Sequence, residues 1–200
     1  MEKPIQVTYK VARNSYAANK LISEIRNYDT FSADFEAATK YTPEEREAME
    51  AELEQNPTKR RRIQLESTLA ATALDHPAHV ALTHCSIAVS DNEAYVFILD
   101  NKPITTLVLN FLVTTQQRQV WHNATFDFKH IYYHIGKLPQ LFEDTQILAK
   151  TILNHVEVFR ANTGLKQLAG HKYGNWAIST DNFDLSTIYD DHVHHYAAID

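Results

Sequence analysis

Residues 79–99, HVALTHCSIAVSDNEAYVFIL, decide the fold of this chain. Two apolar runs, 79–90 and 94–99, flank the polar tripeptide Asp91-Asn92-Glu93, a pattern typical of a β-hairpin with a short turn. Upstream, residues 5–12 (IQVTYKVA) predict another strand, which the hairpin extends into a sheet. Part of that sheet is therefore antiparallel.

A long charged stretch separates this hairpin from the preceding strand, which we predict over residues 30–38 (TFSADFEAA). Residues 42–75 are rich in Glu, Arg, Lys, Gln and Ala, and they open with a capping box at Thr42-Pro43-Glu44-Glu45. The pair Asn56-Pro57 interrupts the helical pattern. We therefore interpret 42–75 as a helical insertion made of two helices, 43–55 and 58–74.

Helices and strands alternate downstream of the hairpin. Residues 103–114 predict an apolar helix, residues 118–122 a short buried strand, and a further helix begins at Asn123 and ends at Gly136. Helical segments and turns follow to the C-terminus. The pattern predicts an α/β fold in which helices flank a mixed sheet, and 200 residues predict a single domain over 1–200.

Composition excludes several classes of protein. With 44% hydrophobic and 22% charged residues, the chain has the composition of a globular protein and not of a disordered one. It lacks a membrane-spanning apolar run and a signal-type N-terminus, so we expect a cytoplasmic protein without a membrane partner. Its 4 glycines form no phosphate-binding loop motif. The single cysteine, Cys85, is expected to be a buried small hydrophobe.

Acidic residues form the first candidate site. Asp34 and Glu36 are two apart in a predicted strand, so both side chains leave the same face. A surface strand with two acids explains this spacing, and so does a cation site, for which hard oxygen ligands favour Mg²⁺ or Mn²⁺. Asp127, in the segment HNATFD (122–127), lies where a strand gives way to a helix, at an edge where open α/β sheets bind ligands.

The C-terminal helical segment contributes a phenol and a carboxylate. Tyr196 and Asp200 are four residues apart, which places them only about 40° apart around a helix. His195 precedes Asp200 by five residues and lies about 140° away, so helix geometry favours Tyr196 as its companion. His192 and His195 also have the i, i+3 spacing of a zinc site, but no Cys or acid completes such a set.

Together, D-x-E at Asp34 and Glu36, N-x-x-F-D ending at Asp127, and Y-x-x-x-D ending at Asp200 resemble the three motifs of the DEDD exonuclease superfamily, in its tyrosine branch. The resemblance covers residues 28–200 and is closest to the proofreading domain of phage-type family A DNA polymerases. It implies a ribonuclease H-like fold and a 3′-to-5′ exonuclease that releases nucleoside 5′-monophosphates from single-stranded or frayed DNA ends.

The same resemblance implies that Asp34, Glu36, Asp127 and Asp200 bind two divalent metal ions, Mg²⁺ or Mn²⁺. Four carboxylates carry −4 and two such ions +4, so the net charge of the loaded chain changes from −6 to −2 and the site no longer repels a phosphodiester. Tyr196 would orient the attacking water. Other implied features are a DNA polymerase domain or subunit as partner, a host-cell cytoplasm if the gene is phage-encoded, and substrate contacts from Asn123, Phe35 and Phe126.

Alternatives remain open at this point. The two phenylalanines alternate toward the core as packing residues would, and Asn123 is equally suited to cap a helix. An exoribonuclease that trims RNA 3′ ends would use the same acids and tyrosine, and a catalytically silent docking domain of a replication complex is a third possibility. The basic run Lys59-Arg60-Arg61-Arg62 is interpreted as a solvated helix start, with contact to substrate phosphates as the alternative.

Overall fold

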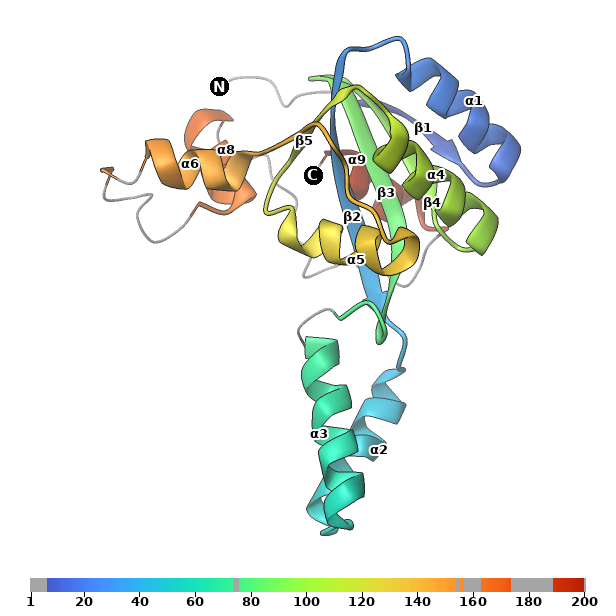
Figure 1. Cartoon of the computed structure of the whole chain (residues 1–200), viewed down its shortest axis with the longest axis vertical. Coiled ribbons are helices and arrows are strands. Elements are labelled where there is room, and N and C mark those ends of the chain that lie inside the picture. Colours follow the sequence, from blue (N-terminus) through green and yellow to red (C-terminus); the bar gives the residue numbers. More distant parts are fainter. Residues whose placement is uncertain (1–6, 74–75, 154, 157–162, 174–188, 200) are drawn as a thin grey trace.

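The computed structural model describes residues 7–73, 76–153, 155–156, 163–173 and 189–199. A six-stranded mixed sheet in the order β1-β4-β3-β2-β5-β6 forms the centre of the molecule (Figure 1). Its strands are β1 (Thr8–Ala12), β2 (Thr30–Thr39), β3 (Val80–Ser90), β4 (Glu93–Ile98), β5 (Arg118–Trp121) and β6 (Phe142–Asp144). The helices are α1 (Ser15–Ile25), α2 (Pro43–Glu54), α3 (Lys59–Ala73), α4 (Lys102–Thr114), α5 (Thr125–Ile135), α6 (Thr145–Ile152), α8 (Leu165–Tyr173) and α9 (Asp191–Ile199).

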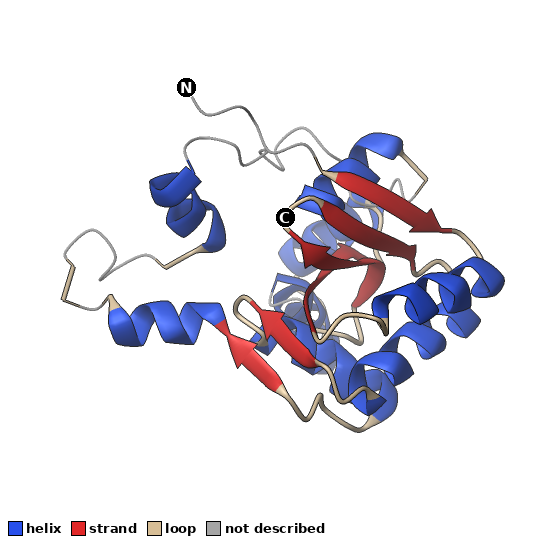
Figure 2. Cartoon of the chain, turned by 90° about the horizontal axis from the view of Figure 1, so that it is seen from above, coloured by secondary structure: helices blue, strands red, loops and turns tan. Residues whose placement is uncertain are grey.

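The hairpin predicted at 79–99 forms β3 and β4, which pair antiparallel, and β2 pairs antiparallel with the other side of β3. The remaining pairs, β1 with β4, β2 with β5 and β5 with β6, are parallel. The prediction of a mixed sheet flanked by helices is therefore confirmed (Figure 2). No helix in the described part of the chain is both long enough and apolar enough to cross a bilayer.

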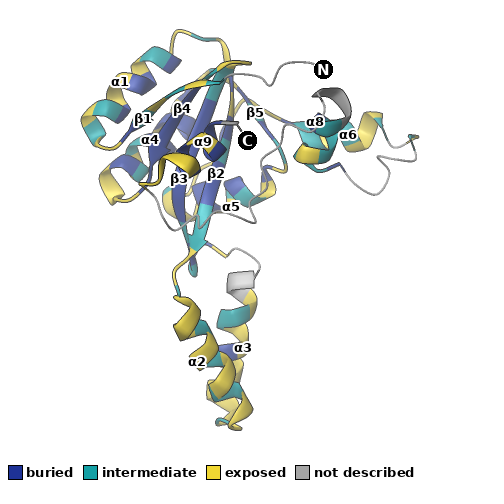
Figure 3. Cartoon of the chain, turned by 180° about the vertical axis from the view of Figure 1, so that it is seen from behind, coloured by how far each residue is buried: buried dark blue, intermediate teal, exposed yellow. Residues whose placement is uncertain are grey.

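Helices cover the two faces of the sheet unequally. Phe35 on β2, Cys85 on β3 and Phe97 on β4 point to one face, where they join the main core with side chains of α1, α4 and α5. Ala94 and Val96 of β4 point to the other face and pack against Ala197 and Ala198 of α9. Figure 3, which views the molecule from behind, shows α9 in front of the buried strands. Because β2 side chains alternate, Asp34 and Glu36 lie on the face that α9 covers.

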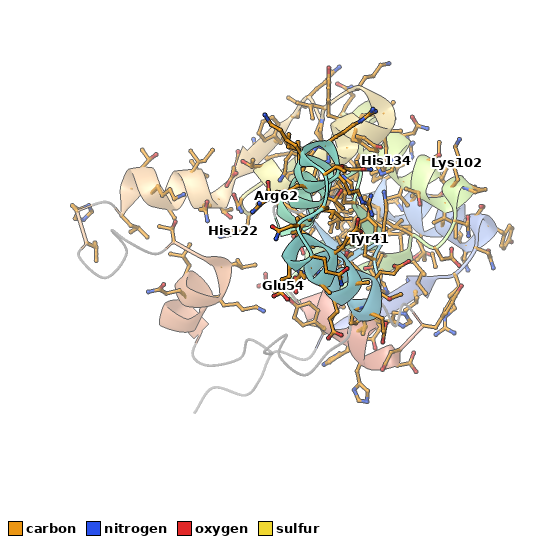
Figure 4. All side chains as sticks on the ribbon, turned by 90° about the horizontal axis from the view of Figure 1, so that it is seen from below. Tyr41, Glu54, Arg62, Lys102, His122 and His134 are labelled. Atoms are coloured by element: carbon orange, nitrogen blue, oxygen red, sulfur yellow. The ribbon has the colours of Figure 1, made fainter. Side chains whose placement is uncertain are left out.

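Helices α2 and α3 form an arm that projects away from the sheet, and most of its surface is exposed (Figures 1 and 3). Thr42 caps α2 through the predicted capping box. Among the described elements, α2 and α3 pack mainly against each other. Arg61 of α3 donates two hydrogen bonds to Glu52 of α2, at 2.7 and 2.8 Å, and Arg62 pairs with Glu66 one turn later. Figure 4 looks toward the tip of the arm and shows side chains such as those of Glu54 and Arg62 around it. Two of the four basic side chains are thus paired within the arm.

That the arm is an insertion in a single domain stays a prediction, and the base of the arm makes it testable. The Lys40 N–H donates to the His79 carbonyl at 2.9 Å, so the chain leaves and re-enters the sheet at one point. Replacing residues 41–78 by Asn-Gly would join β2 to β3 through a two-residue hairpin turn. We expect a folded protein whose melting temperature changes by less than about 5 °C. A shorter connection between β2 and β3 reduces the entropic cost of closing the loop on folding. Circular dichroism during thermal unfolding measures this.

A control variant with a flexible Gly-Ser linker in place of residues 41–78 separates strain in the new turn from loss of the arm. An unfolded or aggregated product with both connections would contradict the insertion and would mean that the arm is part of the folding unit.

Candidate functional site

Asp34 and Glu36 lie on β2, in register with Ser86 and His84 of β3. The Glu36 side chain is buried, with 9% of the residue exposed, and Asp34 is half-buried. The pairing of β2 with β3 shifts by one residue immediately after Glu36. Such bulges twist a strand locally and redirect its side chains, and they are common beside functional sites. A surface strand therefore does not describe this acidic pair, because Glu36 is inside the molecule.

Asp127 reaches the same strand from the first turn of α5. Helix α5 follows β5, whose pairing with β2 covers only Thr30 to Ser32. Beyond that point the N–H of Phe35 donates to Asp127 Oδ1 at 3.2 Å, so the carboxylate takes a position where the neighbouring strand has ended. Asp127 is 2% exposed. The sequence places the three acids on two distant segments, and the fold brings them together.

The charges of Asp34 and Glu36 act on the Asp127 carboxyl. Burial raises the pKa of Asp127 well above its ordinary value, the negative charges of Asp34 and Glu36 raise it further, and hydrogen bonds from backbone N–H groups oppose the rise. Burial also raises the pKa of the Cys85 thiol, and the charges of Asp34 and Asp127 add to it. Cys85 is thus an inert buried thiol, as expected, and it packs beneath the acids on the core side of the sheet.

This donor set matches a hard divalent cation in chemistry. It offers only carboxylate oxygens, which Mg²⁺ and Mn²⁺ prefer, and the mutual repulsion that raises the pKa of Asp127 is what a bound cation would relieve. Among the described residues, no group of three His, Cys, Asp or Glu side chains is assembled closely enough to hold a metal by itself. The fourth predicted ligand, Asp200, lies outside the described residues.

A single carboxylate organises the loop that carries Asp127 toward the acids. Asp144, at the end of β6, accepts hydrogen bonds from the N–H groups of Asn123 (3.2 Å) and Ala124 (2.9 Å), just before α5. It also caps α6, accepting from Gln146 (2.8 Å) and Ile147 (3.2 Å). Burial alone would raise the pKa of Asp144, but the four N–H donors outweigh it and hold the pKa below its ordinary value. Asp144 is thus the N-cap of α6 and also an acceptor for the loop before α5.

The expected helix start at Asn123 is wrong by two residues. Asn123 has φ of 59°, in the left-handed region, and α5 begins at Thr125 with no side-chain cap. Asn123 therefore does not cap this helix, because Asp144 satisfies the local N–H groups instead. Its side chain is exposed beside the site. Phe35 is 3% exposed and packs on Trp121 in the core, on the opposite face from Asp34 and Glu36, whereas Phe126 is half-buried against His130.

Helix α9 places Tyr196 over the face of the sheet that carries the acids. Tyr196 is 4% exposed, whereas the neighbouring His195 is exposed and contacts only Tyr9 among the described aromatic rings. Helix geometry favours Tyr196 over His195, and the burial of the two side chains agrees. The Nζ atom of Lys166, on α8, lies 3.3 Å from the Tyr196 hydroxyl oxygen and 5.0 Å from the centre of its ring.

Sequence reasoning missed three residues here. His84 faces Glu36 across the β2–β3 pair, and its ring meets that of His194 of α9 edge to face, at 5.4 Å between centroids. Both histidines are fully buried. His84 lies within an apolar strand, and His194 is one of three histidines in α9, so neither has a local signal. Lys166 was equally inconspicuous, as one exposed lysine in a helical segment.

No protein-family profile matches the chain, and no curated protein matches its sequence. Solved structures with a similar fold include RNase D of Escherichia coli, an exoribonuclease involved in structured RNA processing, with 16% identity and a TM-score of 0.59. NrnC of Brucella melitensis with bound Mg²⁺ has 15% identity and a TM-score of 0.56, and the EXO domain of Nibbler from Aedes aegypti has 9% and 0.64.

These alignments cover 97%, 98% and 99% of this chain and 41%, 74% and 85% of the other chains, in the same order. The chain therefore spans less than half the length of E. coli RNase D. At such identities the likeness establishes the fold, and the expected ribonuclease H-like sheet is confirmed.

Proposed function

We propose that this chain is a 3′-to-5′ exonuclease that uses two divalent metal ions, Mg²⁺ or Mn²⁺, to hydrolyse phosphodiesters at single-stranded 3′ ends. The observation that carries the proposal is that Asp127 of α5 accepts from the Phe35 N–H, between Asp34 and Glu36 on β2, and that burial and the charges of these two acids raise its pKa. A divalent cation bound among these carboxylates would offset their mutual repulsion, which supports a metal site.

In this proposal, Asp34, Glu36, Asp127 and Asp200 hold the ions. Bound divalent ions make a coordinated water more acidic and neutralise charge on the phosphate. The Phe35 N–H fixes one oxygen of Asp127, so that carboxylate keeps its orientation. Tyr196 contributes a phenol that orients the attacking water by hydrogen bonding, because a phenol with an ordinary pKa near 10 is a poor base. Asp144 sets the position of α5, and with it that of Asp127.

RNA is the substrate class that we favour. Two observations on proteins of similar fold support it: E. coli RNase D is an exoribonuclease, and RNase D of Trypanosoma brucei has been solved with the RNA U12. A DNA 3′ end is the second candidate, because the three acidic motifs resemble those of polymerase proofreading domains. In that case the partner is a DNA polymerase domain or subunit.

A degradation assay tests both the activity and the substrate. Single-stranded RNA and DNA of matched sequence, labelled at the 5′ end, are incubated with the protein in Mg²⁺, in Mn²⁺ or in EDTA. We expect a ladder of products shortened from the 3′ end, release of nucleoside 5′-monophosphates, at least about 10-fold faster cleavage of RNA, and no cleavage in EDTA.

A parallel preparation of Asp34→Ala controls for contaminating nucleases. Faster cleavage of DNA would replace RNA by the proofreading substrate. No metal-dependent cleavage of either polymer would contradict the nuclease and favour a docking domain.

A further inference from the structure

The contact between Lys166 and Tyr196 joins α8 to α9, the helix that packs on the sheet face carrying Asp34 and Glu36. The two residues are 30 positions apart, and the lysine touches the tyrosine twice, through the hydroxyl oxygen at 3.3 Å and over the ring face at 5.0 Å. Tyr196 is buried, with 4% of the residue exposed. Lys166 is exposed to solvent, and its ammonium group lies over the ring of Tyr196. Lys166 therefore lies between the Tyr196 side chain and solvent.

The chemistry of the two groups fixes the direction of this hydrogen bond. An ammonium has three donors and no acceptor, so in this pair the phenol oxygen must accept. The hydroxyl hydrogen of Tyr196 is then directed to a different partner. The adjacent positive charge also polarises the O–H bond, which makes the phenol a stronger donor, as in other charge-assisted hydrogen bonds.

We propose that Lys166 is a positioning residue of this site: it holds the Tyr196 oxygen as an acceptor and so turns the phenol's own hydrogen toward the reacting water or phosphate. The proposal rests on the exonuclease function. It concerns a lysine on α8, a segment without any of the acidic motifs. Because Lys166 acts through Tyr196, its loss has no consequence once the hydroxyl is gone.

A double-mutant cycle with Lys166→Met and Tyr196→Phe tests this dependence. Methionine keeps the length and apolar stem of lysine and removes the charge. We expect Lys166→Met to lower kcat by about 10-fold, with KM changed by less than about 2-fold, because positioning acts on the reacting geometry more than on binding. In the Tyr196→Phe background the same substitution should change kcat by less than about 2-fold. Lys166→Arg, which also only donates, should recover most of the lost rate.

Lys150→Met is the matched control. Lys150 lies on the neighbouring helix α6 and bonds Gln146 within that helix, so its loss should leave kcat and KM unchanged. Multiplicative effects of Lys166→Met and Tyr196→Phe, or an increase in KM alone, would overturn the proposal and make Lys166 an independent phosphate contact. An equal loss in Lys150→Met would overturn it too, as a general effect of surface charge.

A measurement without metal or substrate separates this inference from the proposed function. The substitution Lys166→Met should lower the urea midpoint of unfolding in the wild-type background. The decrease should be at least twice as large there as in the Tyr196→Phe background. Equal shifts would overturn the contact itself, whatever the activity. Coupled midpoints together with an inactive wild type would instead contradict the exonuclease function.

Discussion

Asp127→Asn is expected to abolish the exonuclease activity and to stabilise the metal-free protein at the same time. The amide keeps an oxygen that can accept from the Phe35 N–H, so the local backbone has no reason to move. It removes one of the charges that hold the metals, and kcat should fall by at least about 10³-fold, equivalent to about 4 kcal/mol of transition-state stabilisation. Single-turnover cleavage of a labelled oligonucleotide in Mg²⁺ measures the loss.

The stability of the same variant should depend on pH. Burial and the neighbouring acids raise the folded-state pKa of Asp127, so the folded protein binds more protons than the unfolded chain between the ordinary value of 3.8 and the raised value. Wild-type stability therefore falls as pH rises through that window. Asn has no such penalty, so without metal Asp127→Asn should be more stable by about 1 kcal/mol at pH 8. The advantage should disappear toward pH 4.

Urea unfolding in EDTA across this pH range checks the sign. Asp29→Asn is a suitable control, because it changes a carboxylate just before β2 that is exposed and not part of the acidic cluster. An Asp127→Asn protein that is less stable than the wild type at pH 8 would show that the buried carboxylate is a structural element. Retained cleavage would remove Asp127 from the proposed metal site.

The architecture was predictable because it rests on local patterns. The hairpin at 79–99 is an apolar alternation with a polar turn, the arm begins at a capping box, and Gly136 ends α5 with φ of 70°, a conformation that favours glycine. Each of these signals lies within a few residues of the structure it specifies. The predicted start of α5 at Asn123 failed for the opposite reason, since the group that satisfies its N–H donors is Asp144, 21 residues away.

In the candidate site, too, the features that depend on local sequence patterns were predictable, and those that depend on distant contacts were not. Period-two alternation puts Asp34 and Glu36 on one face, and helix geometry selects Tyr196 over His195. The partnership of Asp127 with β2 depends on where β5 stops pairing, and no sequence pattern encodes that. No sequence pattern encodes the pairing of His84 with Glu36 across β2 and β3 either. Lys166 and Tyr196 come into contact only when α8 packs against α9.

Asp144→Ala is expected to produce the largest loss of stability, because it leaves four backbone N–H groups without their acceptor. Loss of a helix cap costs about 1 kcal/mol, and an unsatisfied donor at a buried position adds a further 1 to 3 kcal/mol, so we expect about 3 kcal/mol in all. For a chain of this size that corresponds to a decrease in melting temperature of roughly 10 °C. Differential scanning calorimetry at pH 7 measures it.

The stability difference between wild type and Asp144→Ala should also depend on pH. The folded-state pKa of Asp144 is lowered, so its stabilisation is complete above the ordinary value and is lost as pH falls through the folded pKa. The difference between wild type and Asp144→Ala should therefore be constant above about pH 5 and should shrink below pH 4.

Asn14→Ala is the matched control for Asp144→Ala, because Asn14 caps α1 by accepting from a single N–H, that of Ala17. It should cost about 1 kcal/mol and leave kcat unchanged. Asp144→Ala should lower kcat by about 10-fold or more even at temperatures where it is fully folded, because a displaced α5 moves Asp127 away from Asp34 and Glu36. If both variants lost the same stability and neither lost activity, Asp144 would be an ordinary helix cap with no influence on the acidic site.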